Sequence, residues 1–361
     1  MMEKLNGLKI LITGGAGFIG GAVIRRLLTS GDSFIFNLDK IGYASDINEI
    51  HRILNDNELS NRYTFLKVDL KDMKEVENAI KISDPDLIIH LAAESHVDRS
   101  IDSPSEFILS NVLGTFNLLE ASREHWSKLS KKRKEKFKFL HVSTDEVFGS
   151  LDVNKKGFHE SYPYDPRSPY SASKASSDHL VRSWFHTYKF PSMITNCSNN
   201  FGPKQFPEKL IPLVIQKALK GEDIPLYGDG SNVRDWLFVE DHVDAILLVI
   251  SKGVIGQSYC VGGFGEKSNI EVVKMICEIL ENLIPSQKVP YHNLINKVKD
   301  RPGHDLRYSI DSSKIQSELG WVPKHSFESA LKKTICWYIE NVDWCEQILS
   351  QSGYELDRKG I

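Results

Sequence analysis

Short apolar runs alternate with amphipathic segments along the first half of the chain. An apolar run at residues 8–13 ends in a glycine-rich turn, after which apolar residues follow at helical spacing to residue 28. Further apolar runs predict strands at 34–38, 63–68, 87–91, 137–142 and 193–196, and the segments 74–81, 112–124 and 171–188 predict helices between them. This alternation predicts a doubly wound, mostly parallel sheet that helices cover on both faces.

After residue 190 the pattern loosens, and several prolines separate shorter elements. Helices are predicted near residues 212–220, 239–250, 270–283 and 327–341. We therefore expect two regions, the parallel sheet in residues 1–190 and a smaller α/β region in residues 191–361, whose elements can interleave.

The composition is that of a globular protein, with 361 residues of which 41% are hydrophobic and 26% charged. A formal net charge of −3 gives no reason to expect a nucleic-acid partner, and the basic run at 128–138 is interpreted as a solvent-exposed connector. Five cysteines without a C-x-x-C pair predict neither a disulfide framework nor a metal site. Since no segment is typical of a signal peptide or a membrane span, we expect a cytoplasmic protein without a membrane partner.

The turn after the first predicted strand has the pattern G-x-x-G-x-x-G, formed by Gly14, Gly17 and Gly20. Such glycines let backbone amides approach a pyrophosphate at the start of a helix. Asp39 ends the second predicted strand 19 residues after Gly20, close to the spacing of about 20 expected for a carboxylate that binds the adenine ribose. The motif therefore predicts a Rossmann-like NAD site. The carboxylate disfavours NADP, although the adjacent Lys40 weakens that preference.

The segment 143–174 carries the candidate chemistry. Tyr170 and Lys174 stand at i and i+4, which predicts that the ammonium lowers the pKa of the phenol and makes it usable as a base. Asp145 and Glu146 follow a predicted strand, and two carboxyls in different protonation states can serve as an acid and a base. A surface Tyr–Lys pair and an acidic helix N-cap are the alternatives. Polar or small residues at 69–70 and 91–95 also follow strands, where ligands bind in open α/β sheets and where plain turn residues are the alternative.

Six motifs spread over both regions give the chain a resemblance to a known family. They are residues 90–100 (HLAAESHVDRS), 143–149 (STDEVFG), 195–202 (TNCSNNFG), 206–212 (FPEKLIP), 233–236 (VRDW) and 300–304 (DRPGH). With the glycine turn and the Tyr-x-x-x-Lys helix, the chain resembles the extended short-chain dehydrogenases/reductases that act on nucleotide sugars, and among them the dTDP-glucose 4,6-dehydratases. It departs from that family at Phe148, usually a tyrosine, and at residues 41–42 (Ile-Gly), usually Leu-Thr.

The resemblance implies an NAD-dependent lyase of deoxysugar biosynthesis. It would convert dTDP-glucose into dTDP-4-keto-6-deoxyglucose by oxidation at carbon 4, loss of water across carbons 5 and 6, and return of the hydride to carbon 6. In the family's scheme Tyr170 is the base of the first step, with Lys174 and Thr144 beside it. Asp145 is then the acid and Glu146 the base of the dehydration.

The resemblance also implies which residues contact each ligand. Those expected to bind the cofactor are Gly14, Gly17, Phe18, Ile19, Gly20, Asp39, Lys40, Asp69, Leu70, Leu91, Ala92, Ala93, Ser95, Ser110, Tyr170, Lys174 and Asn200. Those expected to bind the nucleotide sugar are Ser95, Thr144, Asn199, Lys209, Leu210, Pro225, Tyr227, Arg234, Asn269, Asp300, Arg301, Pro302, Gly303 and His304. Arg234 and Lys209 suit a diphosphate, since one offers bidentate contacts and the other a point charge.

Three other functions stay open at this point. The chain could dehydrate another nucleotide sugar, or it could be a UDP-hexose 4-epimerase, which needs no acid and base at carbons 5 and 6. A non-catalytic dinucleotide sensor is the third. The resemblance further implies a homodimer in which the helices at 112–124 and 171–188 pair as a four-helix bundle, although their apolar faces also suit an ordinary core.

Overall fold

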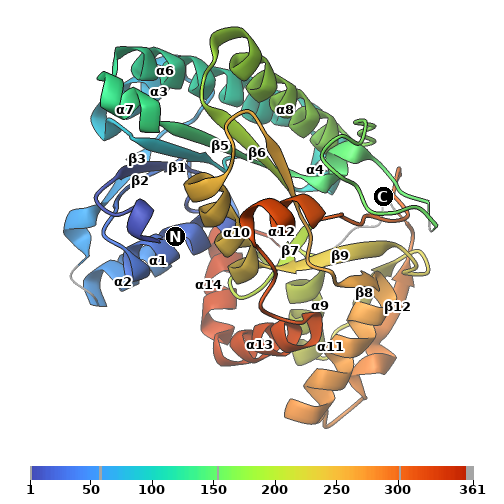
Figure 1. Cartoon of the computed structure of the whole chain (residues 1–361). Coiled ribbons are helices and arrows are strands. Elements are labelled where there is room, and N and C mark those ends of the chain that lie inside the picture. Colours follow the sequence, from blue (N-terminus) through green and yellow to red (C-terminus); the bar gives the residue numbers. More distant parts are fainter. Residues whose placement is uncertain (1, 57–58, 153, 301, 355–361) are drawn as a thin grey trace.

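The computed structural model describes residues 2–56, 59–152, 154–300 and 302–354. Within these ranges the main sheet has seven strands in the order β10-β6-β5-β4-β1-β2-β3, all of them parallel (Figure 1). They are β1 (Lys9–Thr13), β2 (Phe34–Asp39), β3 (Tyr63–Lys67), β4 (Leu87–His90), β5 (Lys138–Thr144), β6 (Ser192–Cys197) and β10 (Ser258–Val261). The predicted α/β fold and the six predicted strands are confirmed, and β10 is an additional strand.

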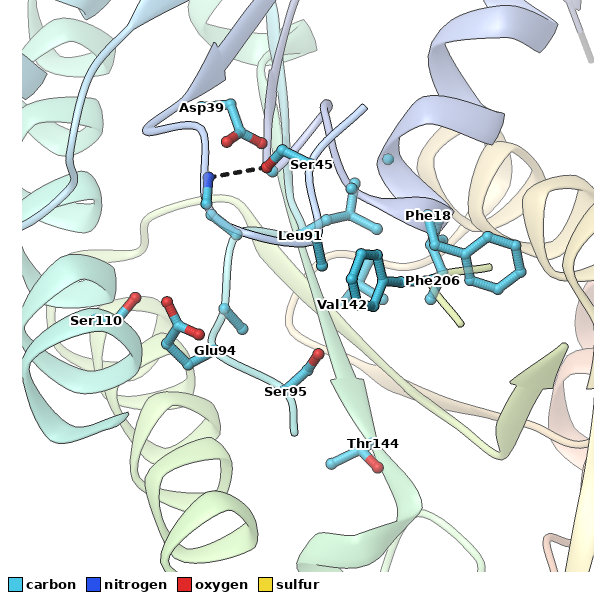
Figure 2. Close-up of a pocket in the computed structure, with 18 of the residues that line it drawn as sticks. Phe18, Asp39, Ser45, Leu91, Glu94, Ser95, Ser110, Val142, Thr144 and Phe206 are labelled. Carbon is cyan, nitrogen blue, oxygen red and sulfur yellow. Dashed lines mark hydrogen bonds between the residues drawn. The ribbon is translucent and has the colours of Figure 1, made fainter. Parts of the chain in front are cut away.

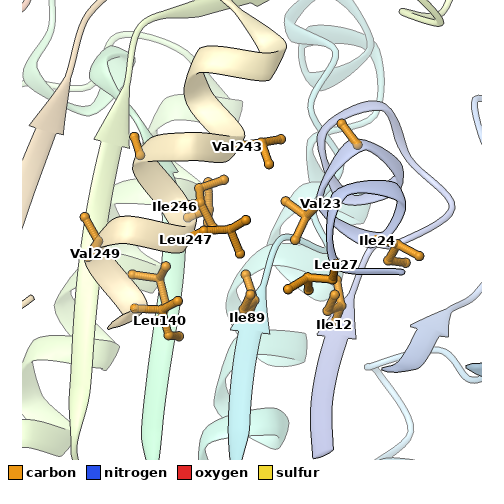
Figure 3. Packing of buried hydrophobic residues seen from close by; sticks show 14 of the residues in the cluster. Ile12, Val23, Ile24, Leu27, Ile89, Leu140, Val243, Ile246, Leu247 and Val249 are labelled. Carbon is orange, nitrogen blue, oxygen red and sulfur yellow. The ribbon is translucent and has the colours of Figure 1, made fainter. Parts of the chain in front are cut away.

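Helices cover both faces of this sheet. On one face lie α1 (Phe18–Ser30) and α10 (Val239–Lys252), whose apolar side chains point toward each other over Ile12, Ile89 and Leu140 (Figure 3). The other face is covered by α3 (Met73–Ser83), α6 (Gly114–Lys128) and α8 (Pro169–Tyr188). Because side chains alternate along a strand, Leu11 packs in this second core while its neighbour Ile12 packs in the first.

Shorter elements precede the first strand of the main sheet or connect its strands. They are α2 (Asn48–Asp56), α4 (Val97–Asp102), α5 (Pro104–Phe107), the π-helix η3 (Ile108–Leu113), α7 (Lys131–Lys136) and the 3-10 helices η1 (Met2–Lys4), η2 (Ser60–Arg62) and η4 (Asp145–Phe148). The basic run interpreted as a connector thus contains the short helix α7. None of the helices in the described ranges is both long enough and apolar enough to cross a membrane.

A smaller part of the molecule packs beside the carboxyl ends of the main sheet (Figure 1). Its strands are β7 (Asn199–Phe201), β9 (Val233–Phe238) and β11 (Glu266–Ser268) in one sheet, with β8 (Ile224–Tyr227) and β12 (Ile295–Val298) as a separate pair. Its helical elements are α9 (Leu210–Lys220), α11 (Asn269–Leu283), η5 (Tyr291–Leu294), α13 (Phe327–Glu340) and α14 (Val342–Ser352), and α12 (Ser313–Leu319) joins the main core. The helices predicted after residue 190 are confirmed as α9, α10, α11 and α13.

Elements from beyond residue 190 return to the first half of the chain. β6, α10 and β10 all follow that residue, yet the two strands lie in the main sheet and α10 packs in its core. The division into residues 1–190 and 191–361 stays a prediction, and these three elements are where the two regions interleave.

Candidate active site

A cavity of about 350 Å³ lies at the carboxyl ends of the parallel strands (Figure 2). Its lining includes both the glycine turn and residues that follow β5, so the cavity joins two motifs that lie more than a hundred positions apart in the sequence. Every residue expected to contact the cofactor lines it, from Gly14 to Asn200. So do Thr144, Glu146, Tyr170 and Lys174 of the predicted catalytic set.

The glycine turn is built for close backbone approach. Gly14 has a φ of +72°, and a Cβ added there would lie 2.7 Å from the Cα of Ala92. A Cβ on Gly20 would lie 2.2 Å from the carbonyl oxygen of Gly14, so any side chain at this position would push α1 away from the turn. Gly17 caps α1 without a side-chain hydrogen bond, which leaves the first amides of the helix available to an anion. This cradle fits the pyrophosphate of a dinucleotide.

Asp39 ends β2 at the edge of the cavity. Its carboxylate accepts hydrogen bonds from the amides of Ala16 (3.0 Å) and Ile41 (2.8 Å). Burial raises the pKa of this carboxyl above its usual value despite these bonds. Beside it, Lys40 donates to Glu94 at 2.6 Å, so its charge is neutralised within the protein. Because the Lys40 ammonium is already paired with Glu94, it weakens the expected preference for NAD over NADP less than the sequence indicates.

Asp145 occupies the first position after β5 and is fully buried. Burial raises its pKa well above the usual value, and the negative charges of Glu146 and Asp235 act in the same direction. One of its oxygens accepts from the Thr144 hydroxyl at 3.3 Å, and within the described residues the other oxygen has no hydrogen-bond partner. Burial and the neighbouring negative charges therefore favour the neutral, protonated form of Asp145, and Glu146 beside it lines the cavity.

Tyr170 and Lys174 stand in the first turns of α8. Ser168 starts this helix through a capping box with Ser171, and Pro169 occupies the first turn, so the position of Tyr170 is fixed by local sequence. The Lys174 ammonium donates to the carbonyl oxygen of Val142 at 3.0 Å.

In the chain without a bound cofactor, the prediction that Lys174 lowers the pKa of the Tyr170 phenol is wrong. Burial raises the pKa of Tyr170 well above its usual value, and the negative charge of Glu146 adds to this. A hydrogen bond with the Thr144 hydroxyl acts in the opposite direction. Desolvation outweighs the i, i+4 spacing because both side chains are buried, with Tyr170 at 8% and Lys174 at 4% exposed.

The residues expected at the nucleotide end divide into two groups. Asn199 and Lys209 line the cavity with Ser95 and Thr144, and the Lys209 ammonium donates to the Ser95 carbonyl oxygen at 3.2 Å. The others are outside its lining, and Arg301 lies outside the described residues. Those outside the lining are Leu210, Pro225, Tyr227, Arg234, Asn269, Asp300, Pro302, Gly303 and His304.

Several residues of the second group nevertheless meet one another. The imidazole of His304 is 2.6 Å from the Asp300 carboxylate, and the imidazole ring contacts the ring of Tyr227. The Tyr227 hydroxyl donates to Asp98 at 3.1 Å.

Arg234 is buried, with its guanidinium 4.4 Å from the ring centroid of Tyr308. The positive charge of Arg234 acts to lower the pKa of Asp145, so this residue is electrostatically close to the acid although it does not line the cavity.

Sequence reasoning missed two contacts, one in the cavity wall and one beside the cavity. Glu208 is buried and accepts from the Tyr43 hydroxyl at 2.8 Å, while the His96 ring lies 3.6 Å from the same carboxylate. Trp344 of α14 donates to Asp46 at 2.7 Å, which ties the end of the chain to the loop beside the glycine turn. No local pattern signals either contact, since each joins residues more than a hundred positions apart. In the described ranges, His, Cys, Asp and Glu form no group of three or more that could hold a metal ion.

The parallel sheet, the glycine turn and the buried Tyr-x-x-x-Lys helix together define a short-chain dehydrogenase/reductase fold with a dinucleotide cradle. The GDP-mannose 4,6 dehydratase family model matches residues 11–334. The dTDP-glucose 4,6-dehydratase of Neisseria meningitidis is 52% identical over 355 residues, which cover 98% of this chain and 99% of that protein. The Escherichia coli dTDP-glucose 4,6-dehydratase is 49% identical over 365 residues, with the same two coverages.

Solved structures agree with these relatives. The dTDP-glucose 4,6-dehydratase of Streptomyces venezuelae, solved with NAD bound, superposes with a TM-score of 0.83 at 40% identity, covering 94% of this chain and 99% of that one. The chain belongs to the dTDP-glucose 4,6-dehydratase family.

Proposed function

We propose that the protein dehydrates dTDP-glucose to dTDP-4-keto-6-deoxyglucose. The observation that carries this proposal is the pair Asp145 and Glu146, since a fully buried carboxyl whose raised pKa favours the protonated form stands next to one that lines the cavity. Elimination of water needs both forms at once, an acid for the leaving hydroxyl and a base for the carbon-bound proton. Oxidation alone or epimerisation at carbon 4 needs neither.

The cofactor of the proposed reaction is NAD. Gly14, Gly17 and Gly20 would hold its pyrophosphate and Asp39 its adenine ribose, as the cradle and the buried carboxylate support. When bound, NAD supplies the hydride acceptor for carbon 4 and the hydride donor for carbon 6, together with the positive charge of its oxidised ring.

The side chains of this chain would move the protons. Tyr170 acts as a phenolate, which the hydrogen bond from the Thr144 hydroxyl stabilises, and it becomes a neutral phenol when it takes the proton of the carbon 4 hydroxyl. Glu146 removes the proton from carbon 5, which the neighbouring ketone makes acidic. Asp145 then gives its proton to the hydroxyl that leaves carbon 6, for which its orphaned carboxyl oxygen is suited.

At the nucleotide end, we propose that Lys209 and Asn199 contact the diphosphate side of the substrate, since both line the cavity. The cluster of Tyr227, Asp300 and His304 is the proposed continuation of the site toward the base. Arg234 keeps its proposed place beside the diphosphate, and its charge also tunes Asp145.

The test compares products by mass. With dTDP-glucose and NAD, the protein should form a product that is lighter by one water, and with UDP-glucose it should form far less. Asp145→Asn and Glu146→Gln should lower this turnover by about 10²–10⁴-fold, as expected for a missing acid or base. A product of unchanged mass would indicate an epimerase, and the absence of any product would indicate a sensor. Equal dehydration of UDP-glucose would indicate that dTDP-glucose is not the specific substrate. Near-normal turnover in either variant would refute the residue roles.

We further propose that the protein is a cytoplasmic homodimer. The π-helix η3, α6 and α8 carry large apolar residues that are exposed in the single chain, namely Ile108, Leu109, Leu113, Phe116 and Tyr188. Such a group of exposed apolar side chains is typical of an interaction surface. Light scattering coupled to size exclusion should give twice the chain mass, and Phe116→Lys should shift the protein toward the monomer. The five free cysteines agree with a reducing compartment, which fractionation of the source cells would test.

A further inference from the structure

Asp178 is a fully buried carboxyl that the proposed chemistry does not use. It lies on α8, four residues after Lys174 and eight after Tyr170, so the three side chains follow one face of the helix. A charged side chain without exposure to water needs strong partners, because desolvation would otherwise keep it neutral.

The contacts of Asp178 lead to three parts of the active site. One carboxylate oxygen is 3.2 Å from Nε2 of His141, and the same nitrogen is 3.5 Å from the Lys174 ammonium. The other oxygen accepts from the Tyr164 hydroxyl at 2.7 Å and from the side-chain amide of Asn196 at 3.0 Å. Asn196 also donates to the carbonyl oxygen of Thr144 at 3.2 Å, at the point where β5 delivers the catalytic residues.

Among the described residues, the titratable groups that interact with Lys174 are Asp178, His141, His90 and Cys197. Burial lowers the pKa of His141 to about 4 and that of His90 well below its usual value, so both rings are neutral near pH 7. Burial also raises the pKa of Cys197 to about 12, which keeps the thiol neutral. For Asp178, burial raises the pKa, but hydrogen bonds from His141 and Ser143 and the charge of Lys174 act against it, and the pKa lies below its usual value. Of these groups, Asp178 alone is negative.

We propose that Asp178 is the positioning residue for Lys174: it supplies the buried counter-charge of the ammonium and, through Asn196, fixes that ammonium relative to the Thr144 end of β5. The inference rests on the proposed function only in giving Lys174 a catalytic task. In this arrangement the buried Lys174 ammonium donates to the carbonyl oxygen of Val142.

The test is Asp178→Asn, which keeps the shape and removes the charge. Without the carboxylate the ammonium is less stabilised, so Lys174 should lose its proton at a pH lower by about one unit, the size expected for the loss of a nearby opposite charge. In the NAD-loaded protein the alkaline limb of the kcat/KM profile for dTDP-glucose should move down by the same amount. The matched control is Tyr164→Phe, which removes a hydrogen bond to the same carboxylate but leaves its charge, and should leave the limb in place.

A second readout separates this inference from the proposed function. In protein with isotope-labelled lysine, the Lys174 signal, assigned from its absence in Lys174→Met, reports the protonation of the ammonium whether or not dTDP-glucose is turned over. If Asp178→Asn does not fold, the reciprocal measurement remains, since Asp178 in Lys174→Met should take up its proton at a higher pH than in the unchanged protein. A Lys174 titration that is the same in Asp178→Asn as in the unchanged protein, or an Asp178 titration that ignores Lys174→Met, would overturn the proposal. A kcat loss without any shift in pH would do the same, because it would indicate a purely structural role.

Discussion

Replacing Asp235 by asparagine should stabilise the protein above pH 6 while it narrows the pH range of activity. Asp235 lies in β9 and is 1% exposed. One of its oxygens accepts from the amides of Gly263 and Gly265, each at 3.1 Å, and the oxygen of an asparagine side chain can accept the same two bonds. Burial nevertheless raises the pKa of this carboxyl from 3.8 to about 6.

The direction of this change in stability follows from proton binding by Asp235. Between the unfolded and the folded pKa, the folded protein holds the Asp235 proton that the unfolded chain has lost, so stability falls as the pH rises through this window. A rise from 3.8 to about 6, at about 1.4 kcal/mol for each tenfold change, corresponds to about 3 kcal/mol lost above pH 6. Asparagine has no proton to lose. The stability gained by Asp235→Asn should therefore increase by about 2 kcal/mol from pH 4.5 to pH 7.

Urea unfolding of both proteins at a series of pH values measures this difference directly. Asp229→Asn is the control with the opposite sign, because hydrogen bonds from Ser231 lower the pKa of that exposed carboxyl. In the activity assay, removing the Asp235 charge should lower the pKa of Asp145, so the alkaline limit of turnover should move to lower pH. A stability difference that does not change with pH would refute the reasoning, since Asp235 would then titrate alike in the folded and unfolded states.

Three further predictions concern the cofactor. Gly20→Ala, whose Cβ would lie 2.2 Å from the Gly14 carbonyl oxygen, should weaken NAD binding by at least about fivefold in calorimetric titration, because overpacking costs about 1–3 kcal/mol. Gly42→Ala, where a Cβ meets open space, is its control. Glu94→Gln should release Lys40 from its ion pair and raise the affinity for NADP relative to NAD by about fivefold, which corresponds to about 1 kcal/mol. An unchanged ratio of the two affinities would argue against a role for Lys40 in this preference. Trp344→Phe removes the hydrogen bond to Asp46 and should speed NAD dissociation by about fivefold in stopped-flow fluorescence, whereas an unchanged rate would mean that α14 does not hold the cofactor loop.

The sequence predicts the features whose causes are local. The glycine turn, the strand that ends at Asp39 and the capped start of α8 each depend on neighbouring residues, and each forms where the pattern indicates. The protonation of Tyr170 could not be predicted, because it depends on burial by elements far away in the chain. The same holds for Arg234, which the motif places near the substrate and the fold turns toward Asp305 and Tyr308. Strand β10 has four residues and no periodic pattern of its own, so only its pairing with β6 makes it a strand.

That pairing has a consequence for how the protein is made. β6 ends at Cys197 and β10 begins at Ser258, so the edge of the growing sheet stays open while 60 residues are translated, which takes roughly 3 to 12 s at about 5–20 residues per second. During this interval β6 offers an unpaired edge to other nascent chains, and the α1 face lacks the cover of α10. The cofactor half therefore cannot mature on the ribosome ahead of the rest. Chaperone demand should be greatest while this middle stretch emerges, and synonymous codons that slow translation there should lower the yield of folded enzyme.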